Sequence, residues 1–370
     1  MNDERARRAR VRAQLLCGSR LRRDPADVVS AIVGVQAQDE TVAALSIRAR
    51  TSGLVAADLW EAVSDARSVV LTWSLRGTRH LHHADDVRWL VGLLGPLFGR
   101  PGRRAQQLGI SGRLGVNAVR VVRQALAANG PLTRRQIKDR LVPLGIDPSG
   151  QASIHVIRRA ALEGVLCIVP NAGSEERYVL MDDWIPARAR VDPESAIAEL
   201  ARRYLAAHGP ATPADLAAWS GLGTAASTRG WAAIAGDLME VELPGGAQWL
   251  LRSRRRAVTD GARRPAPVRL PGGFDALLLG YRDRSLHVPP ERARDVNAGG
   301  GLIKPVVLSD GRVIGTWRHR RDGAALRIEV ASFRRLTPGE RAAVDREARD
   351  IGRFLGMTPT LTIGSADKNS

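Results

Sequence analysis

The sequence predicts an α+β protein made of tandem winged-helix modules, a variant of the helix-turn-helix, followed by a small β-rich domain. Three observations predict this class. Helical segments are followed by short hairpins more than once, two helix ends repeat nearly the same letters, and the hydrophobic period shortens towards the C-terminus. With 370 residues the chain is too long for one ordinary core, so several domains are expected.

The first predicted module covers residues 1–110. A basic amphipathic helix is expected over residues 5–21, a second helix begins at Pro25, and a later helix spans residues 58–66. Residues 69–75 and 79–83 are rich in β-forming residues and are predicted strands, joined by the tight turn Arg76-Gly77-Thr78. Helices followed by such a hairpin have the order of a winged helix.

The second and third modules are predicted over residues 111–190 and 191–260. In each, three helices precede two strands: helices 117–128, 133–142 and 149–163 with strands 166–169 and 177–181, then helices 198–207, 212 onward and 224–235 with strands 239–243 and 248–251. A polar tip, residues 171–174, joins the strands of the second module. Residues 126–133 and 205–212 agree at six of eight positions. Matching order and matching letters together favour tandem modules.

Residues 261–370 form the predicted C-terminal domain. Strands are expected over residues 276–279, 306–308, 313–317 and 326–330, with a hairpin turn at Ser309–Arg312. These antiparallel strands suggest a small, partly closed sheet or barrel. A charged helix over residues 337–355 is expected to close the domain, and the last half-dozen residues are expected to be loose.

Net charge is the strongest bulk signal. The formal charge is +18 with a pI near 11.3, and 53 of the 56 basic residues are arginine. Codon bias explains arginine over lysine, but it does not explain a surplus of basic over acidic residues. Such a surplus indicates a polyanionic partner, most simply nucleic acid.

The N-terminus lacks a secretory signal and no apolar run approaches the ~20 residues that span a bilayer, so we expect a cytoplasmic protein without membrane contact. Cys17 and Cys167 have neither disulfide nor metal-site spacing, and we expect buried structural thiols. His80, His82 and His83 are considered as metal ligands, but no carboxylate or cysteine has suitable spacing, so no metal is predicted.

Enzymatic motifs are otherwise scarce. No dinucleotide fingerprint, phosphate loop or nucleophile elbow is present, and no cofactor is expected. One unusual feature is the pair Gln36 and Gln38, which the pattern places at a helix end just before Asp39, a good N-cap residue. The pair is either a polar helix terminus or two uncharged amides that face a cleft.

Several motifs in order resemble the AlkZ/YcaQ family of bacterial DNA glycosylases, over nearly the whole chain. They are Gln36-Ala37-Gln38-Asp39, the segment from Leu75 to Leu81, the segment from Arg202 to Gly221, and the segment from Lys304 to Trp317. A second glutamine at position 38 resembles the AlkZ-type branch, since the YcaQ-type branch carries an acidic residue there. The AlkZ-type branch is associated with self-resistance to DNA-alkylating antibiotics and acts on alkylated bases and interstrand crosslinks.

This resemblance implies that Gln36 and Gln38 are catalytic. Cleavage of an N-glycosidic bond passes through an oxocarbenium-like sugar with water on the opposite face. A purine alkylated at N7 or N3 is already cationic and leaves readily, so two amide carbonyls suffice to orient the water and stabilise the sugar. The lysines are far from the pair in sequence, so we expect a monofunctional enzyme. Its partner is duplex DNA with alkylated or crosslinked purines, approached through an open, basic, concave site.

Residues 281–290 are also singled out. They form either an ordinary exposed loop or, as the resemblance implies, a hairpin whose His-apolar-Pro tip probes the DNA; His287, Val288 and Pro289 fit that tip. The arginines predicted to contact phosphates are Arg282, Arg284, Arg318 and Arg320.

Two other functions remain open at this point. A winged-helix transcription regulator would bind a specific sequence through a helix in the major groove and release no base, and an architectural protein would bind DNA without selectivity. The sequence does not identify the alkylating agent, whether crosslinks or single adducts are the target, or which wings touch DNA. A monomer is expected.

Overall fold

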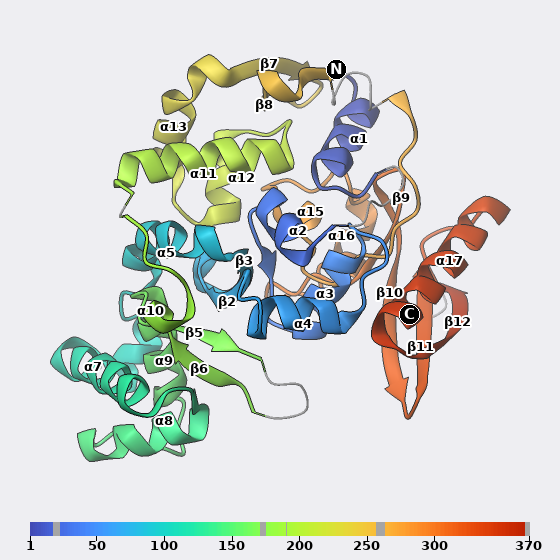
Figure 1. The fold of residues 1–370 in the computed structure, drawn as a ribbon. Helices are drawn as coiled ribbons and strands as arrows, with labels where there is room; N and C mark the ends of the chain where they lie inside the picture. The colour runs from blue at the N-terminus through green and yellow to red at the C-terminus, as the bar shows by residue number, and fades with distance from the viewer. Residues whose placement is uncertain (18–22, 171–174, 190, 257–262, 367–370) are drawn as a thin grey trace. The chain divides into compact units, whose positions relative to one another are not determined.

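The computed structural model describes residues 1–17, 23–170, 175–189, 191–256 and 263–366, and the chain divides into two compact units (Figure 1). Unit 1 combines Met1–Leu59 with Ile197–Ser370, and unit 2 is Trp60–Ala196. In the ranges just given, no helix is long and apolar enough to cross a membrane. Each unit groups parts of more than one predicted module, so the four-part division stays a prediction.

Unit 2 contains strands that pair in the order β3-β2-β5-β6-β4, each pair antiparallel. Its strands are β2 (Val69–Trp73), β3 (Arg79–His83), β4 (Leu132–Thr133), β5 (Leu166–Val169) and β6 (Arg177–Leu180). Its helices are α5 (Ala84–Phe98), α6 (Arg103–Gln107), α7 (Gly112–Asn129), α8 (Arg134–Leu141), α9 (Ala152–Leu162) and α10 (Met181–Trp184), with 3₁₀ turns η1 (Leu75–Gly77) and η2 (Val142–Leu144).

The elements α7, α8, α9, β5 and β6 follow the order predicted for the second module (Figure 1). Helix α8 begins with a capping box, in which Thr133 and Gln136 satisfy each other's backbone N–H groups. β4, between α7 and α8, pairs with β6 and ties the helices to the hairpin. The predicted polar tip 171–174 lies outside the described residues.

Unit 1 contains the same element order once more. Its central part is α11 (Pro193–His208), α12 (Pro213–Ser220), α13 (Thr224–Ala233), η3 (Ala235–Asp237), β7 (Leu238–Leu243), β8 (Gly246–Leu251) and η4 (Arg252–Arg254). Ala211, between α11 and α12, bridges to Trp249 of β8, as β4 bridges to β6 in unit 2. Two segments therefore share one plan, and the total of three winged-helix modules stays a prediction.

The N-terminal part of unit 1 is helical. It comprises α1 (Asp3–Ala13), α2 (Pro25–Ala31), β1 (Val35–Gln36), α3 (Glu40–Arg48) and the start of α4 (Ala56–Ser64). The helix predicted over residues 5–21 is too long at its C-terminal end. Helix α1 ends at Ala13 because Leu15 adopts a left-handed conformation with φ of 58°; residues 18–22 lie outside the described residues.

A four-stranded sheet in the order β12-β11-β10-β9 forms the C-terminal part of unit 1. Its elements are β9 (Val306–Ser309), β10 (Arg312–Asp322), β11 (Ala325–Ser332), α17 (Pro338–Leu355) and β12 (Thr358–Ser365), preceded by η6 (Pro290–Arg292) and α16 (Ala293–Val296). The antiparallel pairing predicted for the strands that became β9, β10 and β11 is confirmed, while β12, a strand that the sequence did not predict, pairs parallel to β11. Helix α17 carries the chain back along the sheet, and such a crossover produces parallel pairing.

The strand predicted over residues 276–279 is wrong. These residues form a short helix, α15 (Ala276–Leu279), in which Asp275 caps the first turn by accepting the N–H of Leu277 at 3.0 Å. Four consecutive apolar residues fit a buried strand or a buried helical turn equally well. The N-cap aspartate is the local signal that favours the helix.

Candidate active site

The glutamine segment is an extended link between two helices and not a helix end. After α2, Val33 and Gly34 take left-handed φ values of 62° and 117°, which stop the helix. A β-branched residue in this region is strained. The chain then runs extended through β1 to Asp39, whose carboxylate accepts the N–H of Val42 at 2.9 Å and starts α3. The N-cap prediction for Asp39 is confirmed, and the helical prediction for Gln36 and Gln38 is corrected.

Burial alternates along this link. Val35 and Ala37 are 2% and 1% exposed, while Gln36 is half-buried and Gln38 is exposed. Both glutamines are therefore less buried than Val35 and Ala37, with Gln36 in β1 and Gln38 at the bend that follows it.

Buried ion pairs fix the helix that follows. Arg50, just past the end of α3, binds both carboxylate oxygens of Asp275 at 2.7 and 2.9 Å and the Gln14 Oε1 at 2.9 Å. Arg48 donates to Glu347 at 3.1 Å and to the Leu270 carbonyl at 2.6 Å. Both arginines are at most 1% exposed. Because α3 starts at Asp39, these contacts also hold the glutamine link in place.

A strand of the C-terminal sheet comes near the same link. The Trp317 indole of β10 donates to the Pro271 carbonyl at 2.9 Å, and a Cβ on the adjacent Gly272 would lie 2.2 Å from the Val42 carbonyl of α3. His319 is two residues further along β10. Burial lowers the pKa of His319, and the nearby Asp39 carboxylate partly opposes that shift. Sequence analysis missed His319, because a lone histidine among strand arginines carries no distinctive signal.

The predicted probing tip is buried in this structure. His287, Val288 and Pro289 belong to a turn instead of a hairpin, and the exposed fractions of His287 and Val288 are 0% and 4%. The His287 Nδ1–H donates to the Gly311 carbonyl at 2.8 Å, and burial lowers the pKa of His287 to about 3. The expectation of an exposed tip is therefore corrected. Packing against Tyr281, whose ring lies 5.8 Å away, accounts for the burial.

The four predicted phosphate-binding arginines differ in their surroundings. Arg282 is exposed, and Arg284 is half-buried, with its Nε donating to the Leu278 carbonyl at 2.6 Å. Arg318 and Arg320 are exposed on one face of β10. Arg318 pairs with Glu329 at 2.7 Å, whereas Arg320 stands opposite Arg327 in the strand register.

These residues do not form a single cluster. His287 contacts Gly311, just before the start of β10, and Arg320 lies further along that strand, roughly 25 Å away at the rise of an extended chain. His319, between Arg318 and Arg320, interacts with Asp39. The structure thus places His319 on the face of β10 that interacts with Asp39, puts Arg318 and Arg320 on the opposite face, and leaves His287 apart from the glutamine link.

Histidines in unit 2 serve the fold. His82 hydrogen-bonds the Ser74 hydroxyl at 2.7 Å, and His80 bonds the Thr78 carbonyl at 3.1 Å. Both are buried. Across the described ranges, no three His, Cys, Asp or Glu side chains are grouped to hold a metal ion. Cys167 is buried and Cys17 is half-buried, each a free thiol.

A strongly basic chain with repeated helix–hairpin segments fits the class of proteins that act on nucleic acid. Comparison with known proteins agrees. A family model described as DNA glycosylase AlkZ-like matches residues 29–354, and the chain belongs to this family. It is thus an enzyme that hydrolyses a glycosidic bond in DNA, and the resemblance found in the sequence is confirmed. A non-enzymatic regulator no longer fits.

Two relatives are similar over nearly their whole length, both from Streptomyces sahachiroi. An interstrand DNA cross-link repair glycosylase is 29% identical over 349 residues, which cover 90% of this chain and 91% of the relative. The solved structure of the DNA glycosylase AlkZ aligns with a TM-score of 0.84 at 26% identity, covering 98% of this chain and all of that one.

Proposed function

We propose that this enzyme excises purines made cationic by alkylation, of the N7-alkylguanine type, and that it unhooks interstrand crosslinks as self-resistance to a DNA-alkylating antibiotic. The observation that carries the proposal is the link between α2 and α3, on which two neutral amides, Gln36 and Gln38, are less buried than the apolar residues beside them. The name of the cross-link repair relative supports the crosslink as substrate.

The proposed chemistry needs no charged catalytic group. The carbonyl oxygens of Gln36 and Gln38 accept hydrogen bonds from one water and aim it at the anomeric carbon of the sugar. The same fixed dipoles stabilise positive charge as the sugar becomes oxocarbenium-like. The bond to the base breaks with its electron pair going to the purine, which leaves as a neutral molecule because it began as a cation.

Accessibility of the pair fits a crosslinked substrate. A base that is tied to the opposite strand cannot be flipped alone into a deep pocket. Gln38 is exposed and Gln36 is half-buried, so the amides can be reached without full extrusion of the nucleotide. Arg318 and Arg320 supply positive charge on the outer face of β10; Arg318 pairs with Glu329, and Arg327, which stands opposite Arg320 in the strand register, pairs with Asp322 at 2.8 Å.

Base release from defined DNA tests the proposal. The substrate is duplex DNA with one N7-methylguanine, and the comparison substrate is its ring-opened form, which keeps the methyl group but has lost the positive charge. We expect fast release of free base from the first and slow release from the second, with no strand cleavage before alkali. Equal rates on both substrates would contradict a requirement for a cationic base.

Substitution of the glutamines tests their roles. Gln36→Ala and Gln38→Ala are each expected to slow single-turnover release by about 10²-fold or more, the range seen when one preorganised polar group is removed. Gln124→Ala, which removes an exposed glutamine of α7, is the matched control and should leave the rate unchanged. Full activity in the double variant would rule out this mechanism.

A further inference from the structure

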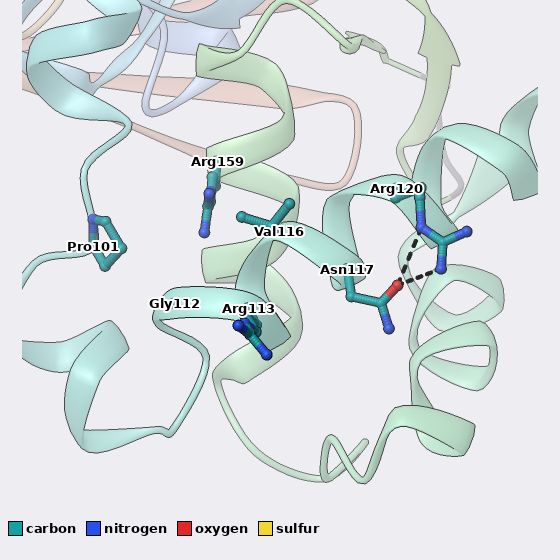
Figure 2. Close-up of a pocket in the computed structure, with 7 residues that line it drawn as sticks. All are labelled: Pro101, Gly112, Arg113, Val116, Asn117, Arg120 and Arg159. Atoms are coloured by element: carbon teal, nitrogen blue, oxygen red, sulfur yellow. Dashed lines mark hydrogen bonds between the residues drawn. The ribbon is translucent and has the colours of Figure 1, made fainter.

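A basic groove lies on unit 2, where the loop after α5 meets α7 and α9. Its central hollow is a cavity of about 640 Å³. Figure 2 shows the residues that line it: Pro101 of the loop, Arg159 of α9, and Gly112, Arg113, Val116, Asn117 and Arg120 of α7. Two further cavities, of about 100 and 1100 Å³, share Pro101 and Arg159 with it. The three hollows therefore adjoin one another around these two residues.

Positive charge dominates the first two cavities of this groove, whereas the third is lined by the carboxylates Glu163, Asp182 and Asp192 as well as by arginines. No carboxylate lines the first two cavities, and the arginines that line them are Arg100, Arg104, Arg113, Arg120, Arg158 and Arg159. Arg159 pairs with Glu163 at 2.7 Å. Two of the other arginines contact neutral groups: Arg120 donates to the Asn117 amide oxygen at 2.6 Å and Arg158 to the Gly77 carbonyl at 3.2 Å.

The like charges affect one another. His155 lines the same groove, and its pKa is lowered by burial and by the adjacent Arg158 and Arg104. Burial also lowers the pKa of Arg158. A cluster of cations held together in this way is stabilised by a bound anion, because the anion removes the mutual repulsion and replaces lost solvation.

Two glycines leave room for the guanidinium groups. A Cβ at Gly115 of α7 would lie 2.5 Å from Arg159 Nη1, and a Cβ at Gly77 would lie 2.3 Å from Arg158 Nη2. Arg159 Nη1 is buried and has no hydrogen-bond partner among the described residues. A buried donor without a partner costs free energy. A ligand oxygen in the groove would satisfy it.

We propose that this groove binds the phosphate backbone of a DNA strand, as a contact with the substrate in addition to the glutamine pair. Arginine binds phosphate with paired N–H donors. Arg113 and Arg120 are two helical turns apart, about 10.5 Å along α7, so both can reach the backbone of one strand. Val116, 57% exposed between them, and Pro101 offer apolar contact to sugars.

The choice of DNA over an acidic protein rests on the proposed function, because DNA is the substrate, and on the groove itself. Exposed arginines spaced along one helix suit a regular array of phosphates, whereas carboxylates of a protein partner would follow no such repeat. Unit 2 would then anchor the duplex while unit 1 supplies the amides.

Salt-dependent binding of lesion-free duplex DNA to the full-length protein tests the groove. The variant Arg100→Gln/Arg113→Gln/Arg120→Gln removes three exposed arginines of the groove, and Arg335→Gln/Arg341→Gln/Arg346→Gln removes three exposed arginines at or on α17 of unit 1. Each lost phosphate contact lowers the slope of log K against log salt by about 0.9. For the groove variant only, we expect the magnitude of this slope to fall by about 2 to 3 and the affinity for DNA to fall at least tenfold.

Other outcomes decide the alternatives. Identical slopes for the wild type and the groove variant would overturn the proposal, as would equal losses in both triple variants. The proposal would also be overturned if polyglutamate competed with the duplex as well as single-stranded DNA of the same charge does, since the groove would then suit an acidic protein. If the triple variant unfolds, Arg113→Gln alone should still lower the slope by about 1.

The test separates this inference from the proposed function. The groove variant keeps Gln36 and Gln38, so it should need a higher enzyme concentration to reach half of its maximal single-turnover rate, whereas Gln36→Ala should lower the maximal rate itself. If the wild type released no base from the cationic substrate, the glutamine mechanism would be refuted. The difference in salt slope between the wild type and the groove variant would not be affected by that result. An unchanged slope with intact base release would refute the groove alone.

Discussion

The two units place their charges differently. Unit 1 buries ionised side chains inside its core, whereas unit 2 keeps its arginines at the surface of the groove. Of the buried charged residues in the described ranges, Asp86 belongs to unit 2 and the rest belong to unit 1: Arg10, Arg48, Arg50, Asp215, Arg269, Asp275 and Glu347.

Chain connectivity gives a reason for this difference. Unit 1 is assembled from two segments that are far apart in sequence, and its buried pairs Arg48–Glu347 and Arg50–Asp275 join one segment to the other. A wrong alignment of the segments would leave a buried charge without a partner, which is strongly unfavourable. Unit 2 is continuous. Its core cluster around Val70, Val91 and Cys167 is apolar, and its arginines remain available for an anion.

The largest expected effect tests the buried pairs of unit 1. Arg50→Leu leaves Asp275, 1% exposed, charged and unpaired in the core. We expect the free energy of unfolding to fall by about 3–5 kcal/mol, measured by denaturant unfolding. Arg318→Leu, which breaks an exposed pair with Glu329, is the control and should cost less than about 1 kcal/mol. Equal effects in the two variants would remove the contrast between buried and surface charge.

A smaller effect tests the apolar packing of unit 2. A Cβ at Gly95 of α5 would lie 2.0 Å from the Leu162 carbonyl of α9, while a Cβ at Gly92 of the same helix meets nothing within 4 Å. Gly95→Ala should destabilise by about 1–3 kcal/mol through overpacking. Gly92→Ala should stabilise by roughly 0.5–1 kcal/mol, the usual gain in a helix. Amide hydrogen exchange should show both changes in unit 2; stabilisation by both substitutions would contradict close packing of α5 on α9.

The smallest effect is a pH dependence of unit 1. His287 has a folded pKa of about 3 because it is buried, whereas an unfolded histidine has a pKa near 6.5. Between these values the unfolded chain binds the extra proton. Stability is therefore full above about pH 6.5 and falls as the pH drops towards 3. Between pH 7.5 and 5.5 this one group should cost about 1 to 2 kcal/mol.

His287→Asn keeps a donor for the Gly311 carbonyl and removes the titrating ring. Denaturant unfolding at the two pH values should show a shallower loss of stability for the variant, even if it is less stable at pH 7.5. His208, also buried with a lowered pKa, would still contribute its share of the acid sensitivity. If the variant lost as much stability between the two pH values as the wild type does, His287 would not be titrating on unfolding.

Sequence alone determined the features that depend on near neighbours. The caps at Asp39, Thr133 and Thr337 start the predicted helices, and the hairpin β2–β3 forms where its turn residues predict it. The ordered motifs, Gln36-Ala37-Gln38-Asp39 among them, identified the family, because they record chemistry at specific positions. The surplus of arginine indicated a polyanion without saying where it binds.

Tertiary structure alone decided burial and pairing. His287 occupies the interior because Gly311 and Tyr281 pack against it, and no local pattern separates that turn from an exposed loop. Arg50 and Arg113 are both arginines on or next to helices. Arg50 pairs with Asp275, which is 225 positions further along the chain, whereas no carboxylate lines the first two cavities of the groove around Arg113. Gln36 and Gln38 are less buried than Val35 and Ala37 because the rest of unit 1 packs against those two apolar residues. Each outcome depends on residues distant in sequence, whose contacts are set only when the chain has folded.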